Sequence, residues 1–129
     1  MKPKLASLKI RVMAEYGSSG LWGFSDAPAG AFRHGMLEHH RLKLPRDLSD
    51  RLDRWILFYE DQSLLPQTDV AALNAEGLQL AQQVQQHLGP ARHVEYQGED
   101  QNGELLAPVV MTFKPEWLQR GGALGSFGP

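Results

Sequence analysis

The sequence contains no cysteine, which removes several classes of chemistry at once. Without a thiol the chain can form no disulfide, no thiolate nucleophile and no cysteine-ligated zinc or iron–sulfur site. Its longest uninterrupted apolar run is Trp55–Tyr59, far short of the roughly 20 residues that a membrane-spanning helix needs. The apolar segment behind the basic start Met1–Lys4 ends at Lys9, too early for a signal peptide. These absences predict a soluble protein of the reducing cytoplasm.

The length and composition predict one globular domain. The chain has 129 residues, of which 42% are hydrophobic and 22% charged, as in ordinary globular proteins. No linker divides it, so we expect a single domain over residues 1–120. Residues 121–129 are rich in glycine, and we expect them to form a mobile tail.

Charge is distributed unevenly along the chain. Residues 1–46 hold eight Lys or Arg against three acidic residues, a net charge of +5. Residues 47–104 hold three basic residues against eleven acidic ones, a net charge of −8, although the whole chain carries only −2. Such a segment repels phosphate, which argues against nucleic-acid binding there and favours a basic partner. The alternative is that solvated helix faces happen to be acidic.

Alternating apolar residues and glycine-containing turns predict two hairpins. Leu8, Ile10 and Val12 alternate with Lys9, Arg11 and Met13, which predicts a strand over about 6–14, followed by a turn at 17–20 and a short strand at 21–24. Residues 25–44 fit an irregular strand and loop. A strand over about 93–97, a turn at 98–103 and a strand over 104–113 form the second hairpin, in which Pro108 requires an edge position or a bulge.

Two amphipathic segments predict helices. The first spans about 45–61, with Pro45 in its first turn. The second ends at Gly89-Pro90, and although Asp69 is an alternative start, Asn74 is the preferred N-cap, with Leu73 and Leu78 placed as a hydrophobic staple. The expected fold is α+β, a single two-layer domain with two helices packed on one face of a mostly antiparallel sheet. The expected core comprises Leu48, Leu52, Ile56, Leu80, Val84 and Leu88, with Trp55 and Tyr59 on the same stripe.

A search for catalytic and metal-binding patterns yields none. His39 or His40 could join His34 and Glu38 around a metal, but no zinc-binding spacing is present. The serines lack a nucleophile-elbow context, and the glycines match no phosphate-binding loop. We therefore expect no catalytic residue, no bound metal and no cofactor.

Acidic residues at predicted loop tips, beside aromatic residues near a turn, are candidates for binding a protein partner. Exposed acids set the orientation and rate of association, and aromatic side chains bury a large area at low entropic cost. An alternative for Trp22 is that it only fills the edge of the sheet. The candidate partner-binding residues are Trp22, Asp26, Glu60, Asp61, Glu99 and Asp100.

Several segments together resemble a known family. They are Lys9-Ile10-Arg11-Val12-Met13-Ala14-Glu15-Tyr16-Gly17, Leu21-Trp22, Leu44-Pro45, Trp55 with Tyr59-Glu60-Asp61, Leu73-Asn74-Ala75-Glu76-Gly77-Leu78 with Leu80-Ala81, Leu88-Gly89 and Val94-Glu95-Tyr96. This arrangement resembles small bacterial immunity proteins of polymorphic-toxin systems, including those of contact-dependent growth inhibition. The resemblance covers most of residues 8–97 and is carried by strand, cap and core positions.

The resemblance implies a stoichiometric inhibitor that binds a cognate toxin domain and has no catalytic residues. Many such toxins are nucleases with basic grooves, which the acidic segment would suit. One alternative is a small enzyme or ligand-binding regulator, with a pocket between the first helix and the sheet that presents His39, His40 and Glu60. Another is a subunit of a larger assembly, contacted through the aromatic turn.

Overall fold

The computed structural model describes residues 8–25, 35–62 and 69–115 of the chain. These residues form five strands, two α-helices and one 3-10 helix. The elements are β1 (Lys9–Val12), β2 (Leu21–Phe24), β3 (Gly35–Met36), η2 (His39–Leu42), α1 (Arg46–Gln62), α2 (Val70–Leu88), β4 (Val94–Tyr96) and β5 (Val109–Val110).

The strands form one mixed sheet in the order β3-β2-β1-β4-β5. Both predicted hairpins are present, since β1 pairs antiparallel with β2 and β4 pairs antiparallel with β5. The two hairpins join through β1 and β4, which run parallel, and the long connection that this pairing needs contains α1 and α2. The α+β fold is thereby confirmed, with three antiparallel pairings around a parallel centre.

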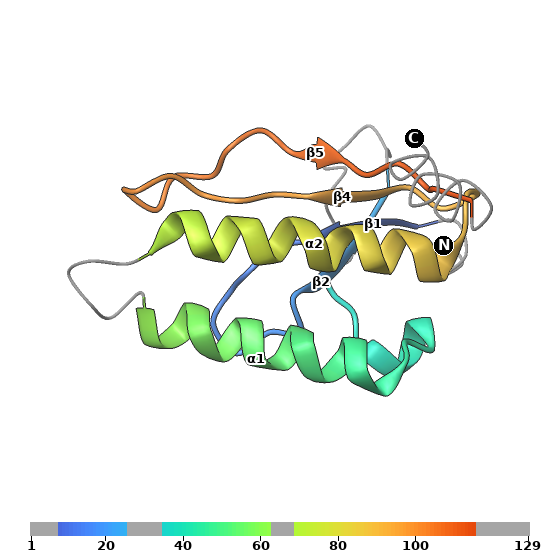
Figure 1. The fold of residues 1–129 in the computed structure, drawn as a ribbon, viewed down its shortest axis with the longest axis horizontal. Helices are drawn as coiled ribbons and strands as arrows, with labels where there is room; N and C mark the ends of the chain where they lie inside the picture. Colours follow the sequence, from blue (N-terminus) through green and yellow to red (C-terminus); the bar gives the residue numbers. More distant parts are fainter. Residues whose placement is uncertain (1–7, 26–34, 63–68, 116–129) are drawn as a thin grey trace, which may run out of the picture.

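The two helices form a layer against one face of this sheet (Figure 1). Ile10 and Val12 are fully buried, whereas Lys9 and Arg11, which alternate with them, are part-exposed, as expected for a strand with one face against the core. Five of the six predicted core residues are buried, and Leu88 packs half-buried against the same cluster. Trp55 is also buried, while Tyr59 is half-buried at the edge of the core.

Gly77 allows α2 to approach β4 closely. A Cβ atom at this position would lie 2.3 Å from Cε1 of Tyr96 and 2.7 Å from Cζ2 of Trp55. The aromatic rings occupy the space that the missing side chain leaves, and the Trp55 indole N–H donates to the Leu73 carbonyl across 2.9 Å. The glycine in this helix therefore has a packing role that offsets its low helix propensity.

The predicted start of the second helix at Asn74 is wrong. α2 begins at Val70, and the Asp69 carboxylate caps it by accepting a hydrogen bond from the Ala72 N–H across 3.0 Å. Asn74 lies inside the helix and Leu78 is exposed, so the staple between Leu73 and Leu78 does not form. A single amphipathic stripe continues through both candidate caps, which is why periodicity did not distinguish them.

The last strand is shorter than predicted but lies where Pro108 required it. β5 comprises two residues at an edge of the sheet, directly after the proline. The predicted irregular region 25–44 contains β3 and η2, while its residues 26–34 and the expected tail 121–129 lie outside the described residues. Among the described helices none is long and apolar enough to cross a membrane.

Candidate acidic interface

The turn between β1 and β2 is fastened to the C-terminal end of α1. The Gly17 N–H donates to the Glu60 carboxylate across 2.7 Å, in a turn where Gly17 has φ +65°. Beside this bond the Tyr16 and Tyr59 rings meet edge to face, with their centroids 5.4 Å apart. Tyr16 is half exposed, so an aromatic ring reaches the surface next to the carboxylates of Glu15 and Glu60.

The turn between β4 and β5 is fastened to α2. The Asn74 side-chain amide donates to the Glu99 carbonyl across 2.9 Å, and its oxygen accepts from the Tyr96 hydroxyl across 2.7 Å. Within the turn, the Asp100 carboxylate accepts from the N–H groups of Asn102 and Glu104 across 2.8 and 3.0 Å. These bonds fix the positions from which Glu99, Asp100 and Glu104 project.

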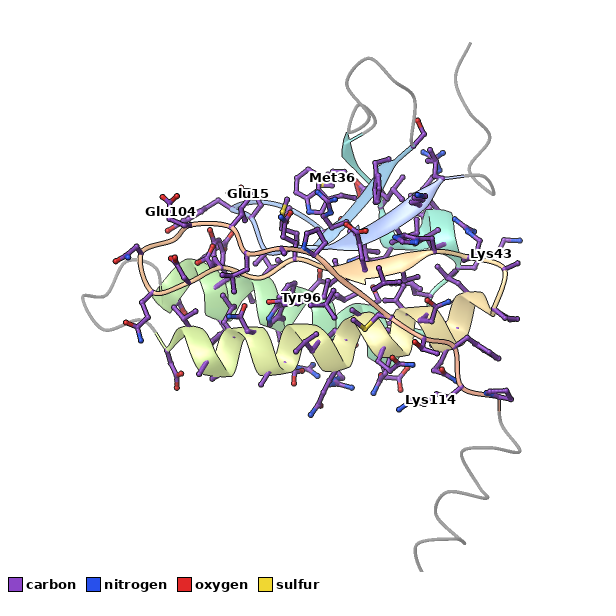
Figure 2. All side chains as sticks on the ribbon, turned by 90° about the horizontal axis from the view of Figure 1, so that it is seen from above. Glu15, Met36, Lys43, Tyr96, Glu104 and Lys114 are labelled. Carbon is purple, nitrogen blue, oxygen red and sulfur yellow. The ribbon has the colours of Figure 1, made fainter. Side chains whose placement is uncertain are left out.

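The two turns bring carboxylates together at one end of the molecule. We call Glu15, Glu60, Glu99, Asp100 and Glu104 the acidic end. Figure 2 shows Glu15 and Glu104 at this end, with Lys43 and Lys114 toward the other end. Among the described residues, no Lys or Arg forms an ion pair with Glu15, Glu99, Asp100 or Glu104.

The titration behaviour of the acidic end reflects this crowding. Partial burial and the negative charges of Glu15 and Asp100 raise the pKa of Glu99 above its ordinary value. Burial, with the charges of Glu99 and Glu15, also raises the pKa of Tyr59 to about 12. Burial is the largest cause of both shifts, and Glu15 contributes to each of them although it lies far from Glu99 and Tyr59 in the chain. A cation placed among these carboxylates would therefore be held favourably.

The structure unites some of the predicted partner-binding residues and separates others. Glu60, Glu99 and Asp100 belong to the acidic end, and Asp61 is exposed in the last turn of α1. Trp22 lies on the sheet face that points away from the helices, where its indole N–H donates to the Met13 carbonyl across 3.0 Å. Asp26 lies outside the described residues.

Sequence reasoning missed two members of the acidic end, Glu15 and Glu104. Glu15 belongs to the basic N-terminal segment, so a count of charge by segment placed it outside the acidic region. Its position just before the turn of the first predicted hairpin was the available signal, because both hairpin turns point to the same end of the sheet once β1 and β4 are parallel. Glu104 lies at the end of the second turn, where its N–H donates to the Asp100 carboxylate.

Two of the three residues predicted to line a pocket, His39 and His40, lie at one hollow of the described residues. A hollow of about 460 Å³ lies beside the start of α1, and among the described residues its lining includes both histidines but not Glu60. The His39 ring is held on both sides, by the Ser49 hydroxyl at 2.5 Å and the Ser19 carbonyl at 2.8 Å. The histidine therefore fastens the first turn to α1.

No metal centre emerges from the described residues, since no three His, Asp or Glu side chains among them lie close enough to share an ion. His34, the partner considered for His39 and Glu38, lies outside them. The chemistry that the acidic end offers is electrostatic attraction of a basic surface.

Comparison with known proteins identifies the family. A family model described as Serratia CdiI immunity protein-like matches residues 8–99, which include both helices and all strands except β5. No curated protein and no solved structure gives a significant match. Since the matched segment is well over half of the chain, the protein belongs to the Serratia CdiI immunity protein-like family and is an immunity protein that neutralises a cognate toxin of contact-dependent growth inhibition.

Proposed function

We propose that the acidic end binds a basic surface of the cognate toxin domain, and that this domain is a nuclease. The observation that carries the proposal is the gathering of Glu15, Glu99, Asp100 and Glu104 without a cationic partner among the described residues. Their mutual repulsion is a cost in the free protein that a basic partner would relieve. A nuclease must hold a phosphate backbone with Lys and Arg, and such a groove is complementary to this end.

In this proposal the protein acts as a stoichiometric inhibitor without enzymatic activity. Carboxylates at the acidic end would occupy or cover the cations with which the toxin binds its substrate. Exposed charges at turn tips also accelerate encounter, because electrostatic steering raises association rates by roughly 10- to 1,000-fold at low salt. Fast capture suits an inhibitor that must bind the toxin before it acts.

Association kinetics with the purified, co-encoded toxin domain test the acidic contact. The structure favours reversing Glu99 and Glu104, since Asp100 accepts two turn hydrogen bonds and its reversal would disturb the loop. The Glu99→Lys/Glu104→Lys variant should associate at least about tenfold more slowly at low salt and show a weaker salt dependence.

The matched control is Asp47→Lys/Asp50→Lys, which makes the same change in net charge by reversing two exposed acids on α1 outside the acidic end. It should leave association nearly unchanged. Equal association rates for the wild type, the double variant and the control at low salt would show that the toxin binds elsewhere.

The nuclease assignment has its own test. The toxin domain alone should degrade RNA or DNA, and one equivalent of this protein should abolish the degradation. A toxin domain that degrades neither nucleic acid would refute the assignment while leaving the binding experiment above valid.

A further inference from the structure

The β5 edge of the sheet is open and apolar. Among the described strands β5 has one neighbour, β4, and its other side faces outward (Figure 1). Leu105, Leu106, Val109 and Val110 are 59%, 46%, 51% and 57% exposed. Residues 105–113 contain no charged side chain, although natural edge strands are commonly protected by charge. Pro108 is the one protective residue in this segment.

Hydrogen bonds to β4 and to its turn show which backbone groups face outward. The Met111 N–H donates to the Val94 carbonyl across 2.8 Å, and Val109 is paired with Tyr96. Because backbone groups alternate in direction along a strand, the N–H and C=O of Val110 point away from β4.

The same argument applies at the other end of the edge. Bonds from Asp100 to Glu104 and from Leu106 to Gly98 flank the bridged pair Glu99 and Leu105. The backbone groups of Leu105 therefore also point outward. Between these two positions the register shifts by one residue, since Glu99 is bridged to Leu105 but Tyr96 is paired with Val109, and this extra residue lets Leu105 and Val110 both face outward. They lie at most about 16 Å apart at the usual rise of a strand and frame an edge that could receive another strand.

The surroundings of this edge define its length and its polarity. Beyond Val110, side chains of α2 form hydrogen bonds with the backbone of the segment. Gln82 donates to the Thr112 carbonyl across 2.8 Å, and the Gln86 amide bonds both the N–H and the carbonyl of Lys114. At the opposite end the edge runs directly into Glu104 of the acidic end. The open segment thus runs from Leu105 to Val110. The negative charge of Glu104 lies beside its first residue, and side chains of α2 cover the backbone after its last.

We propose that the β5 edge receives an extended segment of the toxin domain as an added antiparallel strand. The inference rests on the proposed function, in which the toxin binds the adjoining acidic end. Backbone bonds would form at Val110 and Leu105, and apolar side chains of the segment would cover the exposed Leu and Val residues. Antiparallel pairing places the C-terminal end of the segment beside Glu104, so we expect Lys or Arg there.

A substitution at Val110 tests the added strand. Val110→Pro removes the outward N–H without removing a bond to β4, whereas the matched variant Val110→Thr keeps the N–H and the β-branched shape. Val110→Pro should raise the Kd of the toxin complex about tenfold, and Val110→Thr less than about threefold. Far-UV circular dichroism and thermal unfolding establish that both variants are folded.

Hydrogen–deuterium exchange of the wild type gives a second measurement that needs no variant. Toxin binding should slow exchange of the Val110 and Leu105 amides. Unchanged exchange at both amides would overturn the inference, as would protection of these amides in the free protein, because the edge would then be occupied by the chain itself. A wild-type dimer that Val110→Pro dissociates would overturn it in favour of a second copy of the chain.

The outcome is distinguishable from that of the proposed function. If Glu99→Lys/Glu104→Lys weakens binding while Val110→Pro and amide exchange show no effect, the acidic contact holds and the added strand is wrong. If only Val110→Pro weakens binding, the strand holds and the acidic contact is wrong. Absence of any complex between the wild type and the toxin domain refutes both.

Discussion

The side-chain amide of Asn74 donates a hydrogen bond to the backbone carbonyl of Glu99 across 2.9 Å, which joins α2 to the β4–β5 turn. The same side chain accepts a bond from the Tyr96 hydroxyl, so one residue holds a strand and the turn that follows it. Gly98 makes this approach feasible, since a Cβ there would lie 2.3 Å from the Asn74 side-chain oxygen. The geometry of the acidic end therefore depends on a helix residue that carries no charge.

Replacing Asn74 by alanine should disorder the turn and destabilise the fold. The variant leaves the Tyr96 hydroxyl and the Glu99 carbonyl without this partner, and we expect a loss of about 1–3 kcal/mol in the free energy of unfolding. Urea denaturation measures it, with Gln79→Ala on the exposed face of the same helix as a control. Equal midpoints for the two variants would show that the turn is held by its own backbone bonds.

Neutralising Glu99 should stabilise the free protein and weaken its toxin complex. The pKa of Glu99 is raised in the folded state, so the stability contributed by its protonated form is present at low pH and lost as pH rises through the folded pKa. Glu99→Gln should therefore be more stable than the wild type at pH 7, by up to about 0.5 kcal/mol in the free energy of unfolding for this part-exposed group, and should unfold at a higher temperature. The difference should vanish below the ordinary pKa of a glutamate.

Thermal unfolding of both proteins from pH 3 to 8 measures this dependence. A wild type that is as stable as Glu99→Gln at neutral pH would contradict the repulsion inferred at the acidic end. Toxin binding gives the complementary measurement, because the acidic contact predicts a higher Kd for the same stabilised variant.

The ion pair between Arg11 and Glu95, on the sheet face that points away from the helices, should contribute strongly to the stability of the fold. The guanidinium Nε lies 2.5 Å from a carboxylate oxygen of Glu95, which is buried and also accepts from His93. Arg11→Met would leave a buried carboxylate without its main cation and should cost about 3–5 kcal/mol. The double variant Arg11→Met/Glu95→Met should recover most of this loss, as a double-mutant cycle by chemical denaturation would measure.

The fold class was predictable because its determinants are local. Alternation in β1, the glycine-containing turn after it and the stop at Gly89-Pro90 each specify backbone geometry over a few residues. The parallel pairing of β1 with β4 was not predictable in this way, since it depends on how α1 and α2 cover the sheet. That pairing is also what brings the two hairpin turns to one end.

The candidate site was predictable in part for the same reason. Glu60, Glu99 and Asp100 were found from their places at a helix end and a turn tip, which local patterns define. Glu15 was missed because it joins the acidic end through its proximity to Glu99, which lies more than eighty positions away in the chain. Asn74 was assigned as a cap because its sequence context permits that role, whereas its real partners, Tyr96 and Glu99, come from the other half of the fold.

Two leucines of α2 provide the sharpest test of the packing between the helix and the sheet. Leu80 is fully buried in the core, whereas Leu78, two positions earlier, is 38% exposed. Truncating Leu80 to alanine removes buried apolar volume and leaves a cavity, so we expect a loss of about 2–5 kcal/mol in the free energy of unfolding. The same truncation at Leu78 removes the same atoms from a part-exposed position and should cost less than about 1.5 kcal/mol. Chemical denaturation of both variants measures the difference, and equal losses would mean that α2 packs on the sheet through another face.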